Sequence, residues 1–131
     1  MIVLKTRREL EIMREAGRIS AMALKVAGEA VQPGVTTAEI DKAAFDYIKS
    51  QGATPAFLNY NGFPATACVS VNNEVIHGIP DKKHIIREGD IVSIDLGAVY
   101  NGFYGDNAYT FFCGKVSPAA ERLCTTTKEA L

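Results

Sequence analysis

The sequence predicts an α+β fold in which helices pack beside an antiparallel hairpin. Two amphipathic helical patterns occupy residues 6–52, and each opens with a capping-box signal. Two strand-like runs follow in residues 91–113, joined by Asn101-Gly102, a dipeptide that type I′ hairpin turns prefer. At 131 residues, with 47% apolar and 22% charged residues, the chain has the size and composition of one globular domain.

The two helices are expected to begin where a threonine is followed three residues later by a glutamate, at Thr6 with Glu9 and at Thr36 with Glu39. Apolar residues then recur at helical spacing until glycine or proline stops each pattern. The first pattern contains Leu10, Met13, Ala16, Ile19, Ala23, Val26, Ala27 and Ala30 before Pro33-Gly34, and the second contains Ile40, Ala43, Ala44, Tyr47 and Ile48 before Gly52.

Residues 51–64 are expected to form a loop, here called the aromatic loop, that displays Phe57, Tyr60 and Phe63 among asparagines and glycines. Exposed aromatic surface has to be covered by something. The aromatic loop is therefore a candidate binding element.

Two short strands, residues 66–71 and 75–76, are expected on either side of Asn72-Asn73. A last helix is expected after Ser117-Pro118, because these residue types are favoured at the N-cap and in the first turn. Its apolar pattern continues to the last residue without a stop signal. Either the helix simply ends there or the chain is part of a longer protein.

The hairpin carries two aspartates. Side chains alternate between the faces of a strand, so Asp95 lies on the face opposite the apolar residues Val92, Ile94, Leu96 and Ala98. A two-residue turn places Asp95 opposite Ala108, and Asp106 becomes its diagonal neighbour, with Cα atoms roughly 7–8 Å apart. A β-bulge at Gly105 would change that spacing.

Two carboxylates this close on a partly buried face repel each other and need a shared proton, a cationic side chain or metal ions. Bridging carboxylates suit a site with two metal ions roughly 3.5–4 Å apart. The alternative is a pair of solvated aspartates on an open sheet face, which the low strand propensity of aspartate disfavours.

Two histidines follow the short strands. His77 precedes the loop Gly78-Ile79-Pro80, where an imidazole can donate to a substrate, bind a metal or serve as a structural hydrogen-bonding group. His84 lies in a charged loop and is expected to be exposed.

Charge and cysteine usage exclude several classes of protein. The formal net charge is −1 with both signs interspersed, so there is no cationic stripe for nucleic acid. No apolar run approaches the length of a membrane span, and the charged first ten residues argue against a signal peptide. The cysteines Cys68, Cys113 and Cys124 have no CxxC spacing, which indicates reduced thiols in a cytoplasmic protein.

Four motifs extend from the aromatic loop through the hairpin: Asn59-Tyr60-Asn61-Gly62-Phe63-Pro64; Asn72 through His77-Gly78-Ile79-Pro80-Asp81; Gly89-Asp90-Ile91-Val92-Ser93-Ile94-Asp95; and Gly102-Phe103-Tyr104-Gly105-Asp106. In this order they resemble the type I methionine aminopeptidases, and the resemblance covers nearly the whole chain. It implies half of a pita-bread (creatinase- and aminopeptidase-like) fold, with helices on one face of an antiparallel sheet. Residues 1–131 would be the N-terminal half of the catalytic domain, without its C-terminal half.

The resemblance also implies roles for individual residues. Asp95 and Asp106 match two ligands of a dimetal centre, and His77 matches a histidine that hydrogen-bonds the substrate and stabilises the transition state. Asn72 lies in a loop that helps to bind a monovalent cation in some members. The residues that match walls of the apolar methionine pocket are Tyr60, Phe63 and Cys68.

Two positions depart from the pattern of this family. Phe57 stands where some members have a cysteine in the pocket wall, so the size of the pocket can differ. Asn107 stands where a small hydroxyl residue is common, which affects the hydrogen bonding expected around the second aspartate.

The activity implied is metal-dependent removal of the initiator methionine from nascent polypeptides in the cytoplasm, with two divalent ions that are Mn, Fe, Co or Zn. The family completes its metal site with ligands from the C-terminal half. The expected partner is therefore that half or a second copy of this chain, and neither nucleic acid nor a membrane. The alternatives are an aminopeptidase P or prolidase, and a non-catalytic peptide-binding module or inactive fragment.

Overall fold

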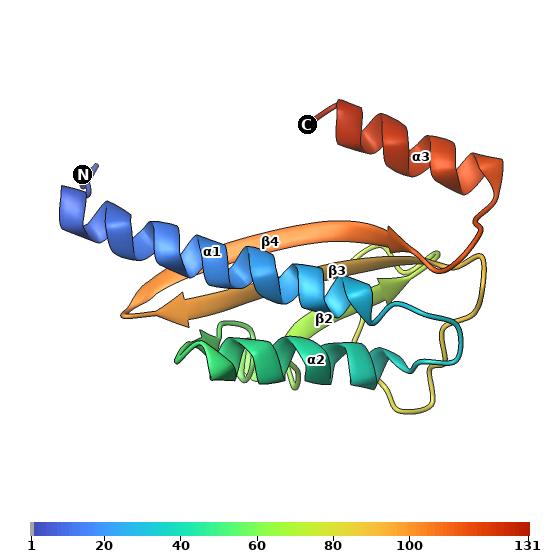
Figure 1. Ribbon diagram of the computed structural model, residues 1–131, viewed down its shortest axis with the longest axis horizontal. Helices are drawn as coiled ribbons and strands as arrows, with labels where there is room; N and C mark the ends of the chain where they lie inside the picture. The colour runs from blue at the N-terminus through green and yellow to red at the C-terminus, as the bar shows by residue number, and fades with distance from the viewer. Residues whose placement is uncertain (1) are drawn as a thin grey trace.

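A four-stranded antiparallel sheet forms the centre of the computed structural model, which describes residues 2–131. Its strands are β1 Thr54–Pro55, β2 Ala67–Val71, β3 Ile91–Tyr100 and β4 Phe103–Phe112. β3 is central: β4 pairs with one of its edges, and β2 and β1 pair in succession with the other (Figure 1). The sheet therefore has two outer edges, one formed by β4 and one by β2 and β1.

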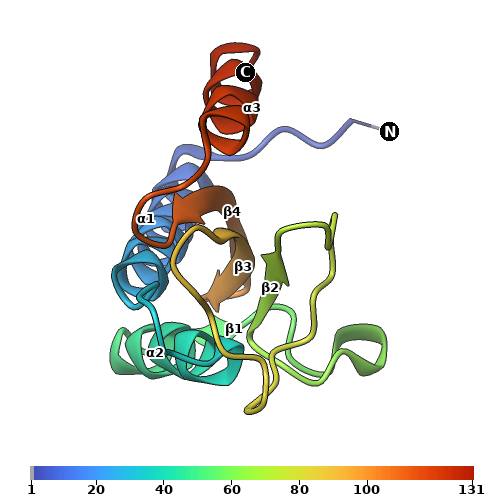
Figure 2. The ribbon, with the colours of Figure 1, turned by 90° about the vertical axis from the view of Figure 1, so that its right-hand side faces the viewer.

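Two helices, α1 Arg7–Glu29 and α2 Thr37–Ser50, cover one face of this sheet (Figures 1 and 2). The core lies between the helices and the apolar face of β3, and the burial predicted for that face is confirmed. Each large side chain buried there contributes about 1.5–3 kcal/mol relative to an exposed position. The largest fully buried apolar side chains are Ile19, Ile40, Ile48, Val69, Ile86, Val92, Ile94 and Leu96.

Both helices begin at the expected threonines. The Thr6 hydroxyl accepts from the Glu9 N–H at 3.3 Å, and the Glu9 carboxylate accepts from the Thr6 N–H at 2.7 Å. Thr36 and Glu39 make the same two bonds at 3.3 and 2.8 Å. Backbone hydrogen bonds from the two threonines lower the pKa values of Glu9 and Glu39. These bonds satisfy donors that the start of a helix otherwise leaves unpaired.

Replacing Thr36 by alanine is expected to lower the free energy of unfolding by about 1 kcal/mol, because the Glu39 N–H loses its side-chain acceptor and keeps only the Thr36 carbonyl at 3.1 Å. Thr36→Ser keeps the hydroxyl and should stay close to the wild type. Urea denaturation followed by circular dichroism measures both variants. Equal losses in the two would mean that Thr36 contributes through its methyl group and not through capping.

The hairpin has the predicted register. Asn101 and Gly102 form its turn with φ values of 47° and 81°, the left-handed conformation that a type I′ turn requires at both positions. Pairing continues to the far ends of both strands, with no bulge at Gly105. Asp95 therefore lies opposite Ala108.

Val75 and Ile76 do not form the strand expected from their sequence. They are 90% and 61% exposed, and the Val71 N–H on the outer edge of β2 donates to the Glu74 carboxylate instead of to them. The carbonyl of Gly78 instead accepts from the Val69 N–H at 2.9 Å. The short strand β1 and the 3-10 helix η1 Tyr60–Gly62 are further elements that the sequence pattern did not predict.

The last helix, α3 Pro118–Glu129, begins at the expected N-cap Ser117. None of its residues is buried, and it stands apart from the sheet (Figure 1). Its Lys128 Nζ lies 3.3 Å from the hydroxyl of Tyr109 on β4. Among the helices of residues 2–131, none combines the length and hydropathy of a membrane-spanning segment.

Candidate metal and substrate site

The hairpin brings Asp95 and Asp106 together on the face of the sheet that points away from α1 and α2. Asp106 pairs with Gly97, two residues from Asp95, so the two aspartates are diagonal neighbours as the register predicts. Asp95 is half-buried and Asp106 is exposed. The pair is thus accessible to solvent, and Asp106 is its more exposed member.

The two carboxylates of the pair disfavour each other's charged form. Burial raises the pKa of Asp95 above its usual range, and repulsion by Asp106 raises it further. His77 has the opposite effect and lowers the pKa of Asp95. The two carboxylates therefore resist ionising together, and a cation held between them would remove that cost.

Cys68 lies on β2 directly opposite Asp95 and is buried. Burial, followed by repulsion from Asp95 and Asp106, raises the pKa of its thiol to about 11. In the metal-free chain the thiol is therefore neutral at physiological pH. A buried neutral thiol behaves as a small apolar surface, which suits a pocket wall.

The aromatic loop packs onto the same face, beside the carboxylates. A Cβ at Gly97 would lie 3.1 Å from Cε1 of Phe57, so a glycine is needed here for the loop to approach. Gly97 pairs with Asp106, which places Phe57 near the second carboxylate. Tyr60 is exposed and Phe63 half-buried, and the Phe63 N–H bonds to the Tyr60 carbonyl at 2.9 Å.

His77 is held near Asp95 by the packing of the next residue. A Cβ at Gly78 would lie 2.3 Å from the Val69 carbonyl oxygen, so the loop touches the edge of β2. The Gly78 N–H also donates to Ser70 Oγ at 3.0 Å. His77 itself has a left-handed φ of 60° and is exposed, so its imidazole is accessible to a ligand.

Asp41 is a site-supporting residue that sequence reasoning missed. One of its carboxylate oxygens accepts from the N–H groups of Thr66 and Ala67 at 2.9 and 2.8 Å, which fixes the start of the strand that carries Cys68. Burial raises the pKa of Asp41, and the two backbone donors partly oppose this shift. No local signal distinguishes Asp41 from other polar residues of α2, because its partners lie 25 and 26 residues away.

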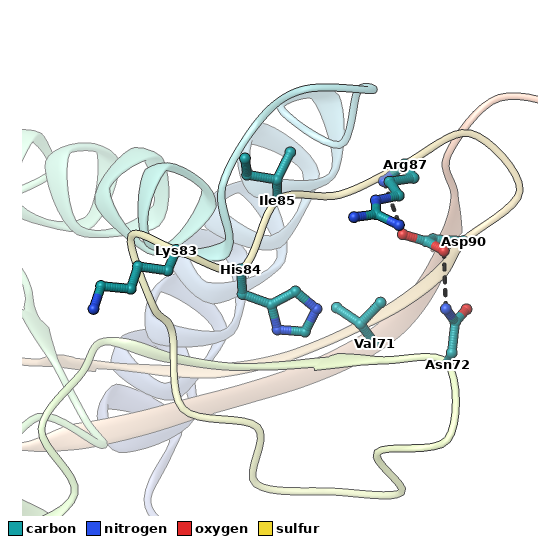
Figure 3. A pocket seen from close by; sticks show the side chains of 7 residues that line it. All are labelled: Val71, Asn72, Lys83, His84, Ile85, Arg87 and Asp90. Atoms are coloured by element: carbon teal, nitrogen blue, oxygen red, sulfur yellow. Dashed lines mark hydrogen bonds between the residues drawn. The ribbon is translucent and has the colours of Figure 1, made fainter.

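The side chain of Asn72 is hydrogen-bonded to other residues of the chain. The amide donates to Asp90 at 2.9 Å, and the amide oxygen accepts from the Ile91 N–H at 3.0 Å. Asn72 and Asp90 also line a surface hollow of about 310 Å³ together with His84 (Figure 3). His84 is half-buried there and not exposed as expected. Neither Asp95 nor Asp106 lines this hollow.

Asn107 points to the opposite face from Asp106, because adjacent strand residues alternate. It pairs with Leu96 on the helix-covered side, so its side chain cannot hydrogen-bond the Asp106 carboxylate. Asn107 therefore gives the second aspartate no side-chain hydrogen bond. Its Oδ1 is buried and has no hydrogen-bond partner among the described residues.

The donor set of Asp95 and Asp106 fits a divalent cation, since carboxylate oxygens bind such ions. Residues 2–131 contain no group of three or more His, Cys, Asp or Glu side chains arranged to hold a metal ion. The two aspartates thus fit as part of a metal site that further ligands would complete.

Relatives named methionine aminopeptidase match almost the whole chain. The protein from Clostridium acetobutylicum is 49% identical over 130 residues, covering 99% of this chain and 52% of the relative. Methionine aminopeptidase 1 of Bacillus subtilis is 48% identical and is matched over 100% of this chain and 52% of its own length. The chain thus spans about half the length of the curated relatives it matches.

Solved structures agree with these relatives. A crystal structure of methionine aminopeptidase from Thermotoga maritima has a TM-score of 0.96 and 41% identity, covering 100% of this chain and 53% of its own. A prolidase from Pyrococcus furiosus has a TM-score of 0.79 and 28% identity, covering 92% and 34%. The α+β fold is therefore half of a pita-bread fold, as predicted. Because the sequence model of metallopeptidase family M24 matches residues 11–131, the chain belongs to that family.

Proposed function

We propose that this chain supplies two metal ligands and part of the methionine pocket for removal of the N-terminal methionine from proteins and peptides. The observation that carries the proposal is the pair of Asp95 and Asp106 beside the buried Cys68 thiol. The relatives that match the whole chain are named methionine aminopeptidase, which supports methionine as the residue released.

In this proposal Asp95 and Asp106 hold divalent metal ions, with Mn, Fe, Co and Zn as the candidates. Such ions, when bound, supply positive charge that polarises the scissile carbonyl. His77 donates a hydrogen bond to the substrate where negative charge develops. A main-chain oxygen of Asn72 is the candidate contact for a monovalent cation, since its side chain is already hydrogen-bonded.

The methionine side chain would lie between the aromatic loop and Cys68. Phe57 packs on Gly97 next to the carboxylates, and Tyr60 and Phe63 follow it in the same loop. Aromatic rings and a neutral thiol suit a thioether through dispersion and S–aromatic contact. The substrate would then cover the exposed aromatic surface of the loop.

We further propose that residues 1–131 are the N-terminal half of a catalytic domain whose other half adds the remaining ligands. Incomplete ligation by the described residues supports this arrangement. The three cysteines are free thiols, which supports action in the cytoplasm on nascent chains.

Methionine release from a Met-Ala-Ser peptide in the presence of Mn²⁺ or Co²⁺ tests this proposal. We expect slow release by the chain alone and none by Asp95→Asn. Release at an equal rate by both proteins would contradict the assigned metal site. Faster cleavage of a peptide with proline in the second position would favour a prolidase or aminopeptidase P instead.

The second candidate function is peptide binding without cleavage. The observation behind it is the lack of a third metal ligand among the described residues. In that case the Met-Ala-Ser peptide would shift the amide resonances of Phe63 and Cys68 in nuclear magnetic resonance spectra, and no methionine would be released. A peptide that begins with Asp serves as the control and should leave these resonances unchanged.

A further inference from the structure

A buried serine contacts the loop that carries His77. Ser70 is 3% exposed, and its hydroxyl accepts a hydrogen bond from the Gly78 N–H at 3.0 Å. Among residues 2–131 the Ser70 hydroxyl has no other hydrogen-bond partner. Burying a hydroxyl without a partner is costly. The contact with the loop therefore accounts for a serine in β2, a strand whose residues are all buried.

Ser70 lies on the face of the sheet that carries the two carboxylates. Its β2 neighbour Cys68 pairs with Asp95, and Ser70 itself pairs with Ser93. Residues two apart on a strand share a face, so the side chain of Ser70 is on the same side of the sheet as that of Asp95. The Ser70 hydroxyl thus joins this face to the loop that follows β2.

His77 precedes the bonded glycine and has an unfavourable backbone conformation. Its φ of 60° lies in the left-handed region, which costs free energy for a residue with a Cβ. The net contribution of one hydrogen bond to stability is of the same order as this cost. A single bond to the neighbouring residue is therefore large enough to decide the conformation of His77.

The bond to Ser70 acts directly on the peptide group that joins His77 to Gly78. Within residues 2–131 it is the one hydrogen bond that this peptide group makes, because the His77 carbonyl accepts none. The Val69 N–H bonds to the next carbonyl, that of Gly78, at 2.9 Å. Without the Ser70 hydroxyl, no hydrogen bond would fix the plane of the peptide group that follows His77.

The far end of the loop is held independently. The Asp81 N–H donates to Thr37 Oγ1 at 2.9 Å, and the Thr37 hydroxyl donates to the Asp81 carbonyl at 3.1 Å. Thr37 is fully buried at the start of α2. Loss of the Ser70 bond should therefore loosen the loop near His77 and leave its far end in place.

We propose that Ser70 is a positioning residue whose hydroxyl, through the Gly78 N–H, holds His77 in the left-handed conformation and so keeps its imidazole beside the aspartate pair. His77 lowers the pKa of Asp95, which indicates that the imidazole lies close to that carboxylate. The consequence for catalysis rests on the function proposed above, in which His77 donates to the substrate. The conformation of His77 itself does not depend on that function.

Nuclear magnetic resonance of the metal-free chain tests the proposal without requiring activity. The wild type should show a strong nuclear Overhauser effect between the amide and α protons of His77, because these protons lie closer together at positive φ than at negative φ. Ser70→Ala is expected to reduce this effect to the level of residues with negative φ, with an unchanged circular dichroism spectrum. A strong effect that persists in Ser70→Ala overturns the proposal.

Ser93→Ala is the matched control. It removes a hydroxyl from the residue that pairs with Ser70, and this hydroxyl bonds to Thr110 at 2.8 Å and not to the loop. The nuclear Overhauser effect of His77 should therefore stay strong in Ser93→Ala. An equal loss in both variants would mean that His77 responds to any change on this face, which overturns a specific role for Ser70.

Amide hydrogen exchange of the wild type is a second test, which holds even if Ser70→Ala does not fold. The Gly78 N–H has a buried acceptor, whereas the N–H groups of His77 and Ile79 have none among residues 2–131. After correction for intrinsic rates, Gly78 should exchange about tenfold more slowly than both neighbours. Equal rates at the three positions overturn the proposal. Both tests remain valid if the chain releases no methionine, so the proposed function and the role of Ser70 can fail separately.

Discussion

Replacing Gly105 by alanine is expected to lower the free energy of unfolding by about 3 kcal/mol, one of the largest effects of a single added methyl group in this chain. A Cβ at Gly105 would lie 2.3 Å from the carbonyl oxygen of Ala16 and 2.7 Å from Cα of Gly17. Both are backbone atoms of α1, so no side chain can rotate away. The helix would have to lift from the sheet and open the core beneath it.

Gly17→Ala is the matched control for this prediction. Gly17 belongs to the same contact, yet a Cβ there would have no atom within 4 Å. Alanine should therefore raise stability by up to about 1 kcal/mol through its helix propensity. Urea denaturation of the three proteins would separate the two effects. If Gly105→Ala were as stable as the wild type, α1 would not lie as close to β4 as the structure has it.

Replacing Asp106 by asparagine is expected to weaken Mn²⁺ binding by about 100-fold or more, since losing a group that merely supports a ligand already costs about 10–100-fold. The chain offers two carboxylates, so the wild type itself should bind weakly, with the ion retaining much of its water. Loss of the free Mn²⁺ signal in electron paramagnetic resonance measures the binding. Asp46→Asn removes an equal charge from the exposed side of α2 and should leave the affinity unchanged.

Without metal and at neutral pH, Asp106→Asn should have a higher free energy of unfolding than the wild type. The pKa of Asp95 is raised by burial and by Asp106, so the folded chain holds that proton more tightly than the unfolded chain does. Stability therefore falls as pH rises through the interval between the unfolded and folded pKa values. Asp106→Asn relieves part of this cost, and its advantage should shrink in acid, where Asp95 is protonated in the folded chain. If Asp106→Asn were less stable than the wild type at neutral pH, the proposed repulsion between Asp95 and Asp106 would be contradicted.

Features that depend on nearby residues could be predicted from the sequence. The Asn101-Gly102 turn fixes the register of the hairpin, and from it the opposition of Asp95 and Ala108 follows by counting. The starts of α1 and α2 follow in the same way from side chains that bond to backbone three residues away. In each case the deciding contact joins residues that are close in the sequence.

Features that depend on distant residues could not be predicted. The apolar residues Val75 and Ile76 have a sequence typical of a strand. In the structure β2 instead bonds to the Gly78 carbonyl along its outer edge, and both residues are exposed to solvent. The support that Asp41 gives to β2 crosses from a helix to a strand. The approach of Phe57 to Gly97 depends on the path of a loop, which residue types do not determine.

Asp95 and Asp106 lie close together in the sequence, which has a consequence for folding. Both belong to one hairpin closed by a two-residue turn, and hairpins of this kind form within about 1–10 µs. The two proposed metal ligands can thus come together before the helices dock, and mutations that loosen the helices would leave the spacing of Asp95 and Asp106 unchanged. The weak point lies elsewhere. A slip of β4 by one residue against β3 would turn Asp106 inward and leave Asp95 without its neighbour.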